Sequence, residues 1–171
     1  SSVTVLLGDD IQKAIDRMNA EGGGVVQLVE GTYKPSTDIN LKSDVSLVGI
    51  GQDITIIDFQ NTAFQVRAVG TLASIMDNFS IKNLTIKDSD ATKQVLYIQF
   101  ADLWSVEDVT IKDGGTTGMI VGDARKFTIS RCTLSSNGGS GLFISATNSR
   151  SIQHFQIISC FSSSNGINGF R

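Results

Sequence analysis

The strongest constraint on the fold of this chain is a pattern that recurs every 23 to 28 residues. Four similar segments begin at Phe79, Trp104, Phe127 and Phe155. Each opens with an aromatic residue, has an apolar residue two positions later, and then has an apolar residue one place out of strict alternation. That offset predicts two short strands joined at a bend. The bend residues are Asn83, Asp108, Arg131 and Ser159.

A third strand completes each repeat, because apolar runs beginning at Val95, Met119 and Leu142 follow the same period. Three short strands per repeat predict a coil of parallel strands in which each repeat is one turn. Equivalent residues then stack about 4.8 Å apart. An antiparallel sandwich gives no reason for such columns to match. The predicted inward columns are Phe79, Trp104, Phe127 and Phe155; Ile81, Val106, Ile129 and Ile157; and Leu84, Val109, Cys132 and Cys160.

Only the segment 9–20 has helical periodicity, with its apolar residues on one narrow stripe. Asp9 or Asp10 is placed to cap the first turn, and the glycines at 22–24 end the helix. A short helix with one apolar stripe is expected to lie as a lid over an apolar surface.

Composition excludes several classes of function. The net charge of −3, with 14 basic and 17 acidic residues, leaves no basic footprint for nucleic acid. No apolar run is long enough to span a membrane. Two cysteines and one histidine cannot form a zinc site of Cys and His ligands, so no metal or cofactor is predicted. The cysteines, stacked in one inward column, are expected to remain free thiols.

The stretch IQKAIDRMNAEGGGVVQLVEGTY, followed by LKSDVSLVGIG, resembles the opening of the pectate-lyase-like superfamily. The resemblance implies an all-β, right-handed, single-stranded parallel β-helix of about five turns with one N-terminal capping α-helix. Residues 1–24 would form the N-terminal strand and capping helix, and residues 25–171 the β-helix, which is expected to be truncated at its C-terminal end. Val29 stands where many relatives have proline. The superfamily includes polysaccharide lyases, hydrolases, epimerases, tailspikes and inert surface proteins, so the resemblance does not fix an activity.

Among the candidate acids, which are Asp102, Glu107, Asp108, Asp113 and Asp123, most have an expected partner one turn away. Asp102 precedes Arg125 by 23 residues, and Asp108 precedes Arg131 by 23. Lys82 is expected to lie beside Glu107 in the same way, and such pairs are ordinary surface structure. Asp123 is left without a partner and is therefore the candidate catalytic acid. His154, the single histidine, is expected to face outward at a strand entry.

One outward column is apolar. Alternation places Tyr97, Ile120 and Phe143 on the outer face of successive turns, with Gln99 and Arg67 beside them. Stacked exposed apolar residues form a patch. The patch suits either a sugar-stacking surface, with Tyr97, Phe143, Gln99 and Arg67 as candidate substrate-binding groups, or a protein contact.

Two functional hypotheses follow. The first, from the resemblance, is a polysaccharide-binding β-helix, extending to lyase, hydrolase or epimerase chemistry on glycans along the exposed sheet. The alternative is a non-catalytic structural or receptor-binding shaft, tailspike-like or a surface protein, or a fragment of one. Whether the chain is an enzyme stays open. The expected ligand is a polysaccharide or glycan. The uncapped C-terminal end is expected either to pack in a homo-oligomer such as a trimer or to continue into further chain. The expected location is extracellular, cell-surface or on a virion.

Overall fold

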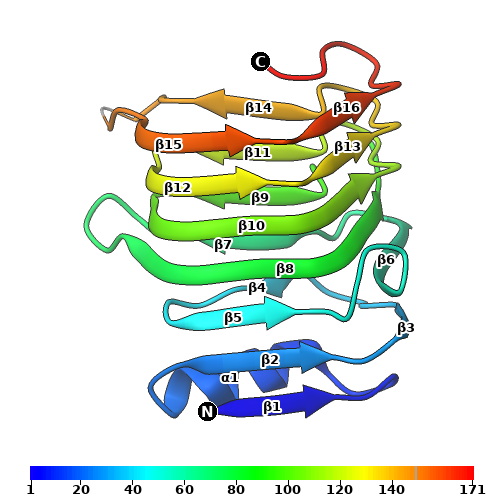
Figure 1. The fold of residues 1–171 in the computed structure, drawn as a ribbon, viewed down its shortest axis with the longest axis vertical. Helices are drawn as coiled ribbons and strands as arrows, with labels where there is room; N and C mark the ends of the chain where they lie inside the picture. The colour runs from blue at the N-terminus through cyan, green and yellow to red at the C-terminus, as the bar shows by residue number, and fades with distance from the viewer. Residues whose placement is uncertain (149) are drawn as a thin grey trace.

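The computed structural model describes residues 1–148 and 150–171, which wind into a coil of parallel strands (Figure 1). One sheet has 11 strands and extends along the whole coil. Its stacked path consists of β1 (Ser2–Val5), β2 (Gly24–Leu28), β5 (Val45–Val48), β8 (Met76–Ser89), β10 (Ala101–Lys112), β12 (Arg125–Ser130) and β15 (Gln153–Ile158). Beyond the bend, the same sheet contains β3 (Gly31–Tyr33), β6 (Thr55–Thr62), β13 (Thr133–Ser135) and β16 (Phe161–Ser163).

The second sheet has five strands and forms the opposite wall of the coil (Figure 1). Its strands are β4 (Ile39–Asn40), β7 (Val66–Val69), β9 (Leu96–Gln99), β11 (Met119–Gly122) and β14 (Leu142–Ser145). We refer to it below as the five-stranded sheet.

The predicted register is confirmed. Trp104 pairs with Phe79 on one side and with Phe127 on the other. The rings of this column stack nearly parallel, with centroids 5.9, 4.4 and 5.1 Å apart from Phe79 through to Phe155. The second inward column also pairs as expected, since Val106 lies between Ile81 and Ile129. The columns fail only at the last turn, where Phe155 and Ile157 stay in register but are 43% and 38% exposed.

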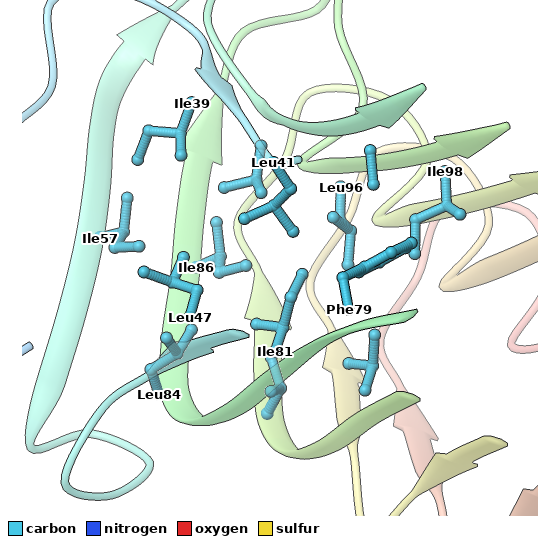
Figure 2. Packing of buried hydrophobic residues seen from close by; sticks show 14 of the residues in the cluster. Ile39, Leu41, Leu47, Ile57, Phe79, Ile81, Leu84, Ile86, Leu96 and Ile98 are labelled. Atoms are coloured by element: carbon cyan, nitrogen blue, oxygen red, sulfur yellow. The ribbon is translucent and has the colours of Figure 1, made fainter. Parts of the chain in front are cut away.

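Figure 2 shows how the buried side chains of both sheets fill the coil. Ile39, Leu96 and Ile98 of the five-stranded sheet and Ile81 and Ile86 of the larger sheet all lie in the space between the two sheets. All five are at most 2% exposed. The apolar core is therefore continuous along the axis, as expected for a solenoid.

The bends depend on left-handed backbone. All four predicted bend residues have positive φ: Asn83 56°, Asp108 53°, Arg131 52° and Ser159 53°. Two further columns repeat this conformation on successive turns, at Asn78, Leu103, Lys126 and His154 and at Asp88, Asp113, Ser136 and Ser164. Positive φ is uncommon outside glycine, so the register imposes it on whatever residue occupies the corner.

The helix α1 (Ile11–Ala20) closes the N-terminal end of the coil (Figure 1). The Asp10 carboxylate caps it by accepting hydrogen bonds from the backbone N–H groups of Gln12 and Lys13. The predicted stripe of apolar residues is buried against the first turns. Within the described residues, no helix is both long enough and apolar enough to cross a membrane.

The coil makes about six turns, against the expected five or so. The first turns lack the aromatic residue that marks the later repeats. Ser46 pairs with Ser80, so Val45 takes the place that Phe79 occupies one turn later. Without that marker, the sequence pattern undercounts the turns.

Candidate functional site

The predicted outward column exists as a stripe on the five-stranded sheet. Ile120 pairs in register with Tyr97 below it and with Phe143 above it. All three side chains are half-buried on the outer face, whereas the alternate residues of β9 and β11 are buried in the core. Arg67 of β7 continues the column next to Tyr97. These four residues are called the outer stripe below.

Three predicted site residues form one hydrogen-bond chain. The Tyr97 hydroxyl donates to Gln99 Oε1 at 2.5 Å, and Gln99 Nε2 donates to Asp123 Oδ2 at 3.2 Å. Gln99 follows Tyr97 by two residues, so the two side chains share a face of β9. Asp123 follows β11 at the corner one turn above. The tyrosine hydroxyl is therefore held in place at the edge of the stripe.

Asp123 is not the unpartnered acid that the sequence predicts. It is fully buried, and Thr147 and Asn148 hydrogen-bond its carboxylate through both backbone and side chain, at 3.0 to 3.4 Å. Burial raises the pKa of Asp123, whereas hydrogen bonds from Asn148, Gln99 and Thr147 lower it. Together the hydrogen bonds outweigh burial, so the pKa lies below the ordinary value. The carboxylate thus holds the corner between β14 and β15 in place.

Asp102 is also paired differently from the expectation. It lies in register with Arg125, but only the Arg125 backbone N–H bonds to it, at 3.1 Å. The ion pair is made by Arg150, whose Nη2 lies 2.6 Å from Asp102 Oδ2 and whose Nη1 donates to the Asp123 carbonyl oxygen. Arg150 lies between β14 and β15, and its side chain reaches Asp102 of β10, two turns away. The Arg125 side chain bonds Ser151 instead.

The other expected ion pairs are confirmed. Arg131 binds Asp108 through two nitrogens, at 2.9 and 2.8 Å. Lys82 lies 3.1 Å from Glu107. These pairs lie on the larger sheet, away from the outer stripe, and are ordinary cross-strand contacts.

The Arg171 guanidinium lies over the ring of Phe143, a contact that the sequence pattern did not predict. The Arg171 guanidinium carbon lies 5.3 Å from the ring centroid. Phe170 bridges Leu142 in parallel, which brings the last residues alongside β14. The Asn-Gly bend that precedes Phe170, similar to the one before Leu142, was the available signal for this pairing.

Arg67 lies beside a groove of about 660 Å³ between α1 and the five-stranded sheet. Its Nη1 is 4.0 Å from Asp38 Oδ2, and its Nε is buried without a hydrogen-bond partner. Lys42 lines the same groove and is exposed. The sequence pattern marks Arg67, whereas Lys42 lies outside every repeat column.

The remaining candidates offer little chemistry. His154 is exposed at the start of β15, as expected. Both cysteines are free thiols, and burial raises the pKa of Cys132 to about 12, so this thiol stays protonated at neutral pH. In the part of the chain that the structure describes, no three His, Cys, Asp or Glu residues gather as metal ligands.

The solved structures that are similar to this chain include a phage protein, a surface adhesin and a tailspike. ORF18 of Geobacillus virus E2 is 23% identical with a TM-score of 0.78, over 94% of this chain and 35% of its own. PfbA, a surface adhesin of Streptococcus pneumoniae, is 15% identical with a TM-score of 0.72, over 90% and 45%. A mutant tailspike protein of E. coli bacteriophage HK620 in complex with a pentasaccharide is 20% identical with a TM-score of 0.64, over 90% and 31%.

The chain thus spans less than half the length of these three proteins. No curated protein matches it. The family model described as "Right handed beta helix region" matches residues 42–170, which is most of the chain. Together with the parallel register and the continuous core, this match shows that the chain belongs to the right-handed β-helix family.

Proposed function

We propose that this protein binds a glycan along the outer face of the five-stranded sheet. The observation that carries the proposal is the outer stripe, in which Tyr97, Ile120 and Phe143 stack in register on three successive turns. Aromatic side chains combined with a few fixed polar groups are typical of ligand sites. A sugar ring has apolar faces and polar edges, so it matches a surface of that kind.

The polar groups beside the stripe support the same proposal. Gln99 is fixed between Tyr97 and Asp123, so its amide is held rather than free to rotate. Ordered donors and acceptors reduce the entropy that binding must overcome. Arg67 adds a cation at the lower end of the stripe.

The similar structures support the proposal at the level of fold. One of them is a tailspike in complex with a pentasaccharide. That tailspike and the surface adhesin also favour our proposal that this protein acts outside the cell or on a virion. At these sequence identities the similarity supports only the fold, so the proposed function depends on the outer stripe.

The proposal is binding rather than bond cleavage. A general acid must reach the glycosidic oxygen, whereas the Asp123 carboxylate is fully buried and already accepts hydrogen bonds from three residues. A catalytic role for Asp123 stays a prediction, to be tested by turnover of any bound glycan with Asp123→Asn.

The test is a glycan array followed by titration calorimetry on the best ligand. We expect Tyr97→Ala and Phe143→Ala each to weaken binding at least about tenfold, because each removes an aromatic contact from the centre of the interface. Phe161→Ala is the matched control, since this aromatic residue is 62% exposed but lies on the larger sheet. Equal losses in all three variants would contradict the stripe as the binding site.

A second candidate function is a structural or receptor-binding shaft. The observation that favours it is a group of large apolar residues exposed on the last turn: Phe155, Ile157, Ile158, Phe161, Ile167 and Phe170. Exposed apolar patches of this kind mark protein contacts. The solution mass distinguishes this candidate and is considered in the Discussion.

A further inference from the structure

The groove beside Arg67 has a defined construction. One wall is α1, and the other consists of β4, β7 and the loop that follows β7. Gln12 fixes the helix to β4: its Nε2 donates to the Asn40 carbonyl oxygen at 3.0 Å, and its Oε1 accepts from the Asn40 N–H at 2.7 Å. Both walls are therefore held rigidly relative to each other.

The charge of the groove is opposite to that of the whole chain. Its lining contains two cations, Lys42 and Arg67, and one carboxylate, Asp16. The chain as a whole has a net charge of −3. Gln12 Nε2 also donates to Asp16 at 3.0 Å, so part of the acid's hydrogen-bonding capacity is used inside the protein.

Of the two cations, Arg67 has one ionic partner at the limit of ion-pair distance and Lys42 has none within the described residues. Arg67 reaches Asp38 only at 4.0 Å, and its Nε–H is buried without an acceptor. Among the ion pairs of residues 1–148 and 150–171, none involves Lys42. The Arg67 side chain is 36% exposed, so a ligand in the groove meets its accessible guanidinium atoms and the exposed Lys42 ammonium.

We propose that the groove is a subsite for an anionic substituent of the glycan, a carboxylate or a sulfate or phosphate ester. The inference rests on the proposed function, because Arg67 pairs directly with Tyr97 and so joins the groove to the outer stripe. A glycan stacked on Tyr97 and continuing along the column would reach Arg67 next, and Lys42 lines the same groove. A guanidinium binds the paired oxygens of such groups with matching geometry.

The experiment compares two pairs of polymers that differ only in charge. Oligogalacturonate against its methyl ester tests a carboxylate, and dextran sulfate against dextran tests a sulfate ester. Titrations are run at 50 and 500 mM NaCl, because salt screens exposed charges. We expect the protein to prefer the charged member of at least one pair, and the preference to shrink at the higher salt.

Variants assign the preference to the groove. Lys42→Gln and Arg67→Gln should each lower the affinity for the charged ligand about fivefold, which is the effect of losing one exposed charge contact. Asp16→Asn should tighten it, since it removes a like charge. Lys126→Gln is the matched control, because Lys126 is exposed on the larger sheet outside the groove.

The outcomes separate the two proposals. Charged and neutral polymers bound equally, or no binding of either pair, would overturn the anionic subsite, while the glycan array with Tyr97→Ala still decides the proposed function. Equal weakening by Lys126→Gln would mean unspecific attraction of polyanions and would also overturn it. Loss in Lys42→Gln and Arg67→Gln, with gain in Asp16→Asn, supports it.

Discussion

At the scale of single residues, the corners of the coil tolerate side chains that do not favour them. Asn and Asp adopt left-handed backbone most readily after glycine, yet Arg131 and Leu103, in two different columns of positive φ, have φ of 52° and 54°. Hydrogen bonds on both sides of each corner hold this conformation. The backbone strain of positive φ is therefore shared among the turns, and the strand pairing between turns offsets it.

Asp108 allows the ion pair and the corner strain to be separated. Asp108→Asn removes the charge but keeps a residue suited to a φ of 53°, so the free energy of unfolding should fall by less than about 1 kcal/mol. Asp108→Ala should cost about 1 kcal/mol more, because alanine is strained there. Urea unfolding followed by fluorescence measures both, since Trp104 is the only tryptophan.

The pH dependence of the same pair has a definite sign. The hydrogen bond from Arg131 lowers the pKa of Asp108 in the folded state. The stabilisation is therefore complete above the ordinary carboxyl pKa and is lost as the pH falls through the lowered value. The difference between wild type and Asp108→Asn should shrink as the pH falls below the ordinary carboxyl pKa, and a difference that does not change with pH would contradict an ionic origin.

The repeat period predicted the partners of some acidic residues but not of others. The period predicted the partners of Asp108 and Glu107, because those pairs lie one regular turn apart. It missed the partners of Asp102 and Asp123, because these come from the long corner after β14. A period predicts residues within columns, but not how an inserted corner folds back.

At the scale of elements, glycines allow the turns to stack closely at the corner after β10, β13 and β16. A Cβ at Gly138 would overlap the carbonyl oxygen of Gly115, and a Cβ at Gly166 would overlap that of Gly138. Gly138 N–H also donates to the Gly114 carbonyl oxygen at 2.8 Å. Backbone therefore lies directly on backbone in this column.

Gly138→Ala should lower the free energy of unfolding by about 1–3 kcal/mol, the usual cost of overpacking. Gly51→Ala is the control, because its Cβ would meet only the flexible end of Ile54, at 3.0 Å. Differential scanning calorimetry of the two variants checks this. Equal melting temperatures would mean that the glycine column moves apart without cost.

At the scale of the whole molecule, the two ends of the coil differ. The N-terminal end is closed by α1, whereas the last turn exposes Phe155, Phe161 and Ile167 among its apolar residues. The sequence predicted the coil, its register and its helical cap.

The exposed last turn predicts self-association. Light scattering on the 18.3 kDa chain should give a mass that rises with concentration, because association buries apolar surface. The double variant Phe161→Asp with Ile167→Asp should return it to a monomer, while Ile50→Asp, at an exposed residue on another corner, should not. A wild-type monomer at all concentrations would remove the main support for the shaft function.

The turns of this coil differ in length only at their corners. The turn from Phe127 to Phe155 has 28 residues against 23 in the turn before, yet both aromatic residues stay in register. Between β5 and β6, a loop likewise leaves the coil, and Gln52 bonds the Arg131 carbonyl oxygen. Such a scaffold can therefore acquire or exchange surface loops while its interior stays unchanged. New specificity can then evolve without a new fold.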